Sequence, residues 1–252
     1  QMSCLPRTRP AKFYDLVVNF SGAATGHQDA SKNEANAVYY IPRPRMDTVV
    51  VVDTSGSMND LNKLGSAKNA ARLYIDQWST DDRIGLVTFA DGANLTKALT
   101  PIQANGQVLT DTKNLLNGLT ANGQTALGSG LKLGQEQLTT QGDASHDQSL
   151  MLLTDGQENV APYWADPAVS GVIAPAKTVV NTIGFGPYTS TWFGLLPQIA
   201  GATGGAFGAV DEPGAVSAAA IASPDTLAVF PATTANKLAD VYKYAAEQLL
   251  GE

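Results

Sequence analysis

The sequence predicts an α/β fold, in which a doubly wound and mostly parallel central sheet carries helices on both faces and one antiparallel edge strand. First, strand patterns and helix patterns alternate from residue 48 onward, which favours a parallel sheet with crossover connections. Second, residues 49–52 and 150–153 are continuous apolar runs, typical of strands buried on both faces. Third, each run leads into a polar loop, at Asp53 and Asp155, where open α/β sheets bind ligands.

Residues 1–47 form an N-terminal extension outside this alternating pattern. Short strands are expected at 15–20 and 37–41, joined by a polar loop, so the extension is either an edge hairpin or the remnant of a neighbouring module. Pro42 and Pro44 interrupt regular structure before the first buried strand.

Residues 48–252 are predicted to form the main domain. The expected strands after the first are 82–90, 94–99 (the antiparallel edge strand), 149–154, 177–184 and 206–210. The expected helices are 61–78, 107–118, 126–139, 192–200 and a closing amphipathic helix at 235–250. Residues 211–234 hold three prolines and little periodicity, and we interpret them as an insertion before the last helix.

Composition excludes several classes of function. The chain has 16 basic and 23 acidic residues and a net charge of −7, which argues against nonspecific nucleic-acid binding. One cysteine allows no intrachain disulfide, and two histidines without a metalloprotease motif argue against a zinc protease. No window reaches the apolar length of a membrane span. The low charged fraction of 15%, with many Thr, Asn, Gln and Gly residues, favours a secreted or cell-surface protein.

Oxygen-bearing side chains follow the first buried strand at every second position, namely Asp53, Ser55 and Ser57. A carboxylate and two hydroxyls at this spacing can converge on one small, hard cation. Thr125 lies in a later glycine-rich loop, and Asp155 follows the second buried run. The first loop alone could equally be a turn that caps the following helix, since Asp and Ser are good caps.

Together these residues resemble the von Willebrand factor type A family, whose metal-ion-dependent adhesion site (MIDAS) has an Asp-x-Ser-x-Ser loop, a distant Thr and a later Asp. The resemblance covers residues 46–210 and looks closest to the calcium-activated chloride channel regulator group and its bacterial relatives. It implies a Rossmann-like sheet and a metal site. The site residues would be Asp53, Ser55, Ser57, Thr125 and Asp155.

The resemblance implies a role for each residue type. The three hydroxyls would coordinate directly, and the two aspartates directly or through water, so that the ion keeps positive charge for an acidic side chain of a protein partner. Mg2+ is the expected ion, and Ca2+ and Mn2+ also suit hard oxygen ligands. In some family members the last helix slides on binding, and here 235–250 would be that helix.

We therefore expect a non-catalytic, cation-dependent protein-binding module of the adhesion type. The alternative is an intracellular scaffold or an accessory subunit of a metal chelatase, because type A domains also occur in such assemblies. An enzyme is disfavoured. Asp53 is followed by Ser55 where an aspartyl phosphotransferase needs a second Asp, and Ser57 lacks the flanking glycines of a hydrolase elbow. No phosphate-binding loop with Gly-Lys occurs.

Overall fold

The computed structural model describes residues 12–20, 30–40, 44–156, 158–186, 194–210, 218–223 and 226–231. The chain divides into two compact units, Gln1–Pro44 and Arg45–Glu252. In the first unit, β1 (Lys12–Phe20) pairs antiparallel with β2 (Ala30–Tyr40) in a two-stranded sheet. Neither β1 nor β2 pairs with a described strand of the main sheet. The domain boundary predicted at residue 47 stays a prediction.

The second unit is built on an eight-stranded sheet with the order β10-β9-β8-β7-β6-β3-β4-β5. The five strands β8, β7, β6, β3 and β4 run parallel, and β5 pairs antiparallel at one edge, as predicted. The strands are β3 (Met46–Asp53), β4 (Arg83–Phe89), β5 (Ala93–Pro101), β6 (Asp147–Thr154), β7 (Val179–Phe185), β8 (Phe207–Val210), β9 (Ala218–Ser223) and β10 (Thr226–Pro231).

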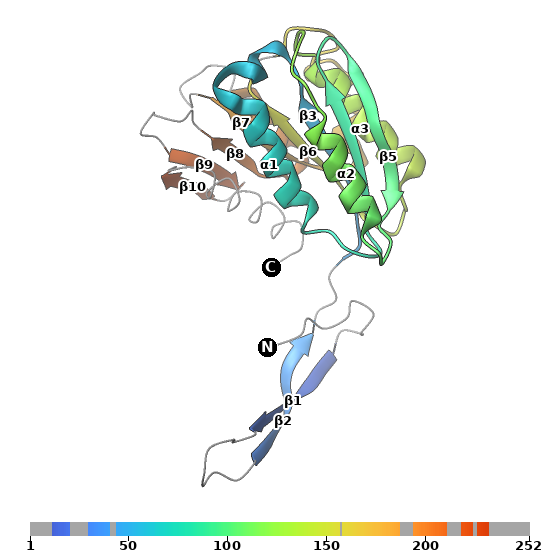
Figure 1. The fold of residues 1–252 in the computed structure, drawn as a ribbon, viewed down its shortest axis with the longest axis vertical. Helices are drawn as coiled ribbons and strands as arrows, with labels where there is room; N and C mark the ends of the chain where they lie inside the picture. The colour runs from blue at the N-terminus through green and yellow to red at the C-terminus, as the bar shows by residue number, and fades with distance from the viewer. Residues whose placement is uncertain are drawn as a thin grey trace. The chain divides into compact units, whose positions relative to one another are not determined.

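Helices cover both faces of this sheet, which confirms the predicted fold class (Figure 1). The helical elements are η1 (Gly56–Asn62), α1 (Lys63–Ile75), α2 (Gln107–Asn117), α3 (Leu127–Gln141), α4 (Ser170–Ile173), η2 (Ala174–Ala176) and α5 (Leu195–Thr203). Side chains of a strand point alternately to the two faces. Val50 and Val52 therefore share a core with α1 and α2, whereas Val49 and Val51 share one with α3, α4 and α5.

The sheet has a topological switch point beside β3. The chain passes from β3 to β4 on one side, whereas β6 and β7 lie on the other side of β3. In doubly wound sheets the loops at the carboxyl ends of such strands diverge and leave room for a ligand. The loops that follow β3 and β6 are the two that the sequence marks with Asp53 and Asp155.

Several elements differ from the sequence-based expectation, among them β2, which begins at Ala30 and not at residue 37. The helix expected from residue 61 begins at Lys63, because Leu61 and Asn62 have left-handed backbone angles, with φ of 50° and 59°. The predicted insertion at 211–234 contains β9 and β10, an antiparallel hairpin that extends the sheet. The short helices between residues 170 and 176 were not predicted, and the expected helix at 235–250 lies outside the described residues.

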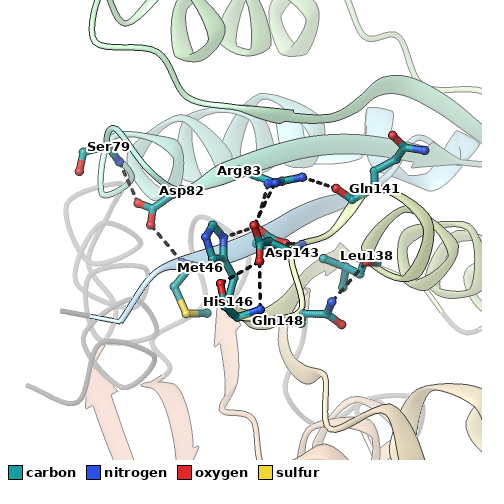
Figure 2. A network of polar contacts seen from close by, with 11 residues as sticks. Met46, Ser79, Asp82, Arg83, Leu138, Gln141, Asp143, His146 and Gln148 are labelled. Atoms are coloured by element: carbon teal, nitrogen blue, oxygen red, sulfur yellow. Dashed lines mark hydrogen bonds and ion pairs between the residues drawn. The ribbon is translucent and has the colours of Figure 1, made fainter.

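A buried polar network lies at the amino-terminal end of β3, the end away from the switch point (Figure 2). The carboxylate of Asp47, which is fully buried, bonds His146 Nδ1 at 2.7 Å and accepts the backbone N–H of Asp143 at 2.6 Å. Arg83 Nε lies 3.7 Å from the same carboxylate, and Asp82 accepts the backbone N–H of Met46 at 3.1 Å. The network thus ties the starts of β3 and β4 to the loop before β6, at the sheet end away from the switch point.

Candidate metal site at the switch point

Asp53 is the last residue of β3, and its side chain is buried in the first loop of the site. One carboxylate oxygen accepts the backbone N–H of Ser55 at 2.7 Å, and the other accepts the hydroxyl of Thr154 at 2.5 Å. Burial raises the pKa of the Asp53 carboxyl from 3.8 to about 6, against the lowering effect of these hydrogen bonds. A buried carboxylate held in this way favours a cation beside it, because a buried charge is costly unless an opposite charge accompanies it.

The hydroxyls predicted as ligands lie side by side. Ser55 Oγ is 3.2 Å from Ser57 Oγ, and Ser57 donates to Asp155 Oδ1 at 2.8 Å. A Cβ placed on Gly156 would lie 3.5 Å from Thr125 Oγ1 and 3.8 Å from Ser57 Oγ, which puts the threonine hydroxyl beside the same cluster. The structure therefore brings together all five residues that the sequence predicts for the site.

Backbone hydrogen bonds lock the Ser55 loop against the loop of Thr125. Gly56 N donates to Gly123 O at 2.9 Å, and Asn122 N donates to Thr54 O at 2.8 Å. Gly123 has a φ of +87°, a conformation that only glycine adopts readily, so the glycine-rich character of this loop has a structural cause. The two loops, about seventy residues apart in the chain, form one rigid frame around the hydroxyls.

Two residues that sequence reasoning did not single out position the site. Thr154 donates to Asp53 and thereby joins the ends of β3 and β6. Asn159 accepts the backbone N–H of Thr125 at 2.8 Å and donates its own N–H to Thr125 O at 3.1 Å. Asn159 lies four residues after Asp155. A polar amide so close behind a predicted ligand is a sequence signal that could have marked Asn159 as part of the site.

A third unpredicted residue brings a positive charge into the site. Lys63 Nζ lies 2.8 Å from Asp155 Oδ2, in a salt bridge whose side chains are 14% and 0% exposed. Asp155 therefore has one oxygen toward the hydroxyl of Ser57 and the other toward an ammonium group. In the sequence, Lys63 lies near the start of the amphipathic helix expected at 61–78, and no motif marks it as part of the site.

The rim of the site holds acids and aromatics with different roles. Asp91 accepts the backbone N–H of Gln124 at 2.9 Å, so it supports the threonine loop. Glu158 accepts the N–H of Trp164 at 2.8 Å, and burial raises the pKa of its carboxyl. Trp164 is buried in the core, whereas Tyr163 is 40% exposed.

The donor set suits a small, hard, divalent cation. In an octahedron with Mg2+–O distances of 2.0–2.1 Å, neighbouring ligand oxygens lie about 2.9 Å apart. The Ser55–Ser57 and Ser57–Asp155 spacings of 3.2 and 2.8 Å bracket this value. Within the described ranges, no group of three or more His, Cys, Asp and Glu side chains is placed to hold a metal, so a soft-ligand site is absent there. The residues present therefore fit a cation bound mainly by neutral hydroxyls.

The match of residues 48–157 to the model of the von Willebrand factor type A domain covers both loops of this site. Residues 48–157 form a von Willebrand factor type A domain. This confirms the resemblance that the Asp53, Thr125 and Asp155 motifs predict.

Relatives of known sequence share the domain over part of their length. The mouse calcium-activated chloride channel regulator 3A-1 is 28% identical over 153 residues, which are 60% of this chain and 16% of the mouse protein. The chain spans less than half the length of the curated relatives it matches. Among its described helices, none combines the length and the apolar character needed to cross a bilayer.

Solved structures share the fold of the type A domain. The von Willebrand factor type A protein from Catenulispora acidiphila has a TM-score of 0.62 at 19% identity, covering 96% of this chain and 50% of that one. Proximal thread matrix protein 1 from the mussel byssus, in a structure with a zinc-occupied MIDAS motif, has a TM-score of 0.57 at 23% identity, covering 81% and 46%. At these identities the likeness extends to the fold alone.

Proposed function

We propose that this type A domain is a non-catalytic, divalent-cation-dependent protein-binding module. The observation that carries the proposal is the convergence of Ser55, Ser57 and Thr125 hydroxyls with the carboxylates of Asp53 and Asp155 at the carboxyl end of the sheet. The zinc-occupied MIDAS of the mussel protein, in a similar fold, supports a cation in such a loop arrangement.

Each residue has a role in this proposal. Ser55, Ser57 and Thr125 offer neutral oxygens to the cation, and Asp53 supplies negative charge while its hydrogen bond to Ser55 N fixes the loop. Asp155 orients the hydroxyl of Ser57. When bound, the cation would supply an electrophilic position for an Asp or Glu carboxylate of a partner protein. Mg2+ is the expected ion, and Ca2+ and Mn2+ are compatible with the same oxygens.

The position of the described histidine argues against a serine hydrolase that uses a histidine base. Such an enzyme needs the imidazole within hydrogen-bond reach of its nucleophilic hydroxyl. His146, the one histidine within the described part of the chain, bonds Asp47 at the opposite end of β3, away from Ser55 and Ser57. We propose a secreted or cell-surface location on the basis of the weakly charged, polar composition and the likeness to chloride channel regulators.

Removing the two serine hydroxyls tests the metal site without changing its charge. Metal-free protein is titrated with Mg2+, Mn2+ and Ca2+ by calorimetry, beside a Ser55→Ala, Ser57→Ala double variant. We expect saturable binding to the wild type and at least about a tenfold loss of affinity in the variant, because two of the neutral ligands are gone. Ser66→Ala in α1 is the control and should bind as the wild type does.

The melting temperature provides a second readout, since an ion that binds only the folded state stabilises it. Cation-loaded protein is then tested for binding to an immobilised Asp-containing peptide, with chelator as the reference. The absence of saturable cation binding by the wild type at millimolar concentration would contradict the proposal. If the protein binds the cation but does not bind the peptide through its carboxylate, the proposal of a metal site stands and the proposal of a protein-binding role is rejected.

A further inference from the structure

Lys63 holds a position that its local sequence does not favour. It is the first residue of α1, where the positive end of the helix dipole opposes a cation, and the first turn carries no acidic residue. The two residues before it, Leu61 and Asn62, are non-glycine residues in left-handed conformations. This conformation is energetically unfavourable for residues with a side chain. Some other contact must therefore hold Lys63 in place.

One such contact is the salt bridge between Lys63 and Asp155. The carboxylate is 0% exposed and the lysine side chain 14% exposed, so water screens the pair far less than it screens a surface pair. Lys63 Nζ takes one oxygen of Asp155, while the other oxygen takes the hydroxyl of Ser57. Local rules that are broken beside a candidate site indicate a functional constraint.

We propose that Lys63 is a tethered cation that neutralises Asp155 and thereby sets how much positive charge a bound metal retains for an anionic partner. This inference rests on the proposed metal site. With Lys63 in place, the two carboxylates and the ammonium carry a net charge of −1, so a divalent ion leaves the site positive. Without Lys63 the two carboxylates alone would balance the ion, which would bind more tightly and attract an external carboxylate less.

The test is a titration with the metal alone. Mn2+ and Mg2+ affinities of metal-free protein are measured by calorimetry for the wild type, Lys63→Met and Lys63→Gln, the second variant serving if the first does not fold. Removal of a neighbouring positive charge should raise metal affinity by roughly tenfold or more. Lys63→Arg keeps the charge and should stay within about threefold of the wild type.

Lys113→Met is a matched control for the loss of one positive charge. Lys113 pairs with Asp76, which directly follows the last residue of α1. Lys63 is the first residue of this 13-residue helix, so Asp76 lies about 20 Å from Lys63. This variant should bind the metal as the wild type does. In the metal-free state, the Lys63 variants lose the charged partner of a buried carboxylate, so their melting temperature should fall. Saturating metal should then raise it by more than it raises that of the wild type.

The outcomes separate the two proposals. Tighter metal binding by folded Lys63 variants than by the wild type supports the role of Lys63. Saturable wild-type binding with equal or weaker binding by the variants overturns that role and leaves the metal site intact. If the wild type does not bind metal at millimolar concentration, the metal site is overturned, and the inference about Lys63 with it.

Discussion

Replacing Asp53 by Asn should strongly weaken cation binding and at the same time stabilise the metal-free protein at neutral pH. The carboxylate is fully buried, and burial raises the pKa of Asp53 to about 6. A tenfold change in an equilibrium constant corresponds to about 1.4 kcal/mol, so keeping the carboxyl ionised above pH 6 costs the folded state about 3 kcal/mol. Asn avoids this cost but forfeits the charge that a divalent ion requires, and metal affinity should fall by at least about a hundredfold.

The net stabilisation should be smaller than that cost, about 1–2 kcal/mol. The Asn amide oxygen can still accept the N–H of Ser55, but the amide NH2 group cannot accept the hydroxyl that Thr154 donates to the aspartate. The lost hydrogen bond offsets part of the gain.

The pH dependence has a definite sign. Between about pH 4 and pH 6 folded wild type keeps a proton on Asp53 that the unfolded chain has released, so its stability falls as pH rises through this window. The Asp53→Asn variant lacks this slope, and metal affinity of the wild type should weaken below about pH 6 as the carboxyl takes up its proton. Urea denaturation at several pH values, with and without Mg2+, measures both effects. Parallel pH profiles for the two proteins would contradict the prediction.

Replacing Asp47 by Ala should destabilise the domain by about 3–5 kcal/mol without affecting cation binding, because it leaves buried polar groups without their charged partner. His146 Nδ1 at 2.7 Å, with a side chain 6% exposed, and the backbone N–H of Asp143 at 2.6 Å both depend on this carboxylate. Six residue steps along β3 separate Asp47 from Asp53, a distance of about 20 Å.

The control for Asp47→Ala is Asp76→Ala. Asp76 pairs with Lys113 through a side chain that is 51% exposed, and exposed pairs are worth less than about 1 kcal/mol. Urea denaturation of the two variants, together with a Mn2+ titration of each, measures the comparison. Equal losses in the two variants would show that the network of Asp47 does not hold the sheet end together, and a loss of Mn2+ affinity in Asp47→Ala would show that the two ends of β3 are coupled.

The sheet and the cluster of site residues could be predicted for the same physical reason. A parallel strand that is covered on both faces needs a continuous apolar run. The valines from Val49 to Val52 provide it, because their side chains pack alternately into the two hydrophobic cores. The carboxyl ends of parallel strands meet at one edge, so residues that follow two such runs had to lie near each other. This explains why Asp53 and Asp155 come together although about a hundred residues separate them.

Other features leave no periodic trace in the sequence. The β9 strand reads Ala-Ala-Ala-Ile-Ala-Ser, whose small residues have weak strand propensity, and its pairing with β8 is a tertiary contact. The start of α1 is shifted to Lys63 because the two preceding residues adopt left-handed backbone angles, although neither is the glycine that usually marks such positions. The contact of Lys63 with Asp155 spans 92 positions and depends on a long side chain, which no spacing rule reports.

The backbone hydrogen bonds between the Ser55 and Thr125 loops have a consequence for the speed of loading. Gly56 with Gly123, Thr54 with Asn122, and Ala90 with Ala126 hold the donors in place through main-chain contacts that involve none of the proposed ligand side chains. Because these contacts order the two loops before the cation binds, binding requires little further ordering of the chain. The slow event is then the release of water by the ion itself, and Mg2+, which dehydrates reluctantly, would enter more slowly than the larger Ca2+.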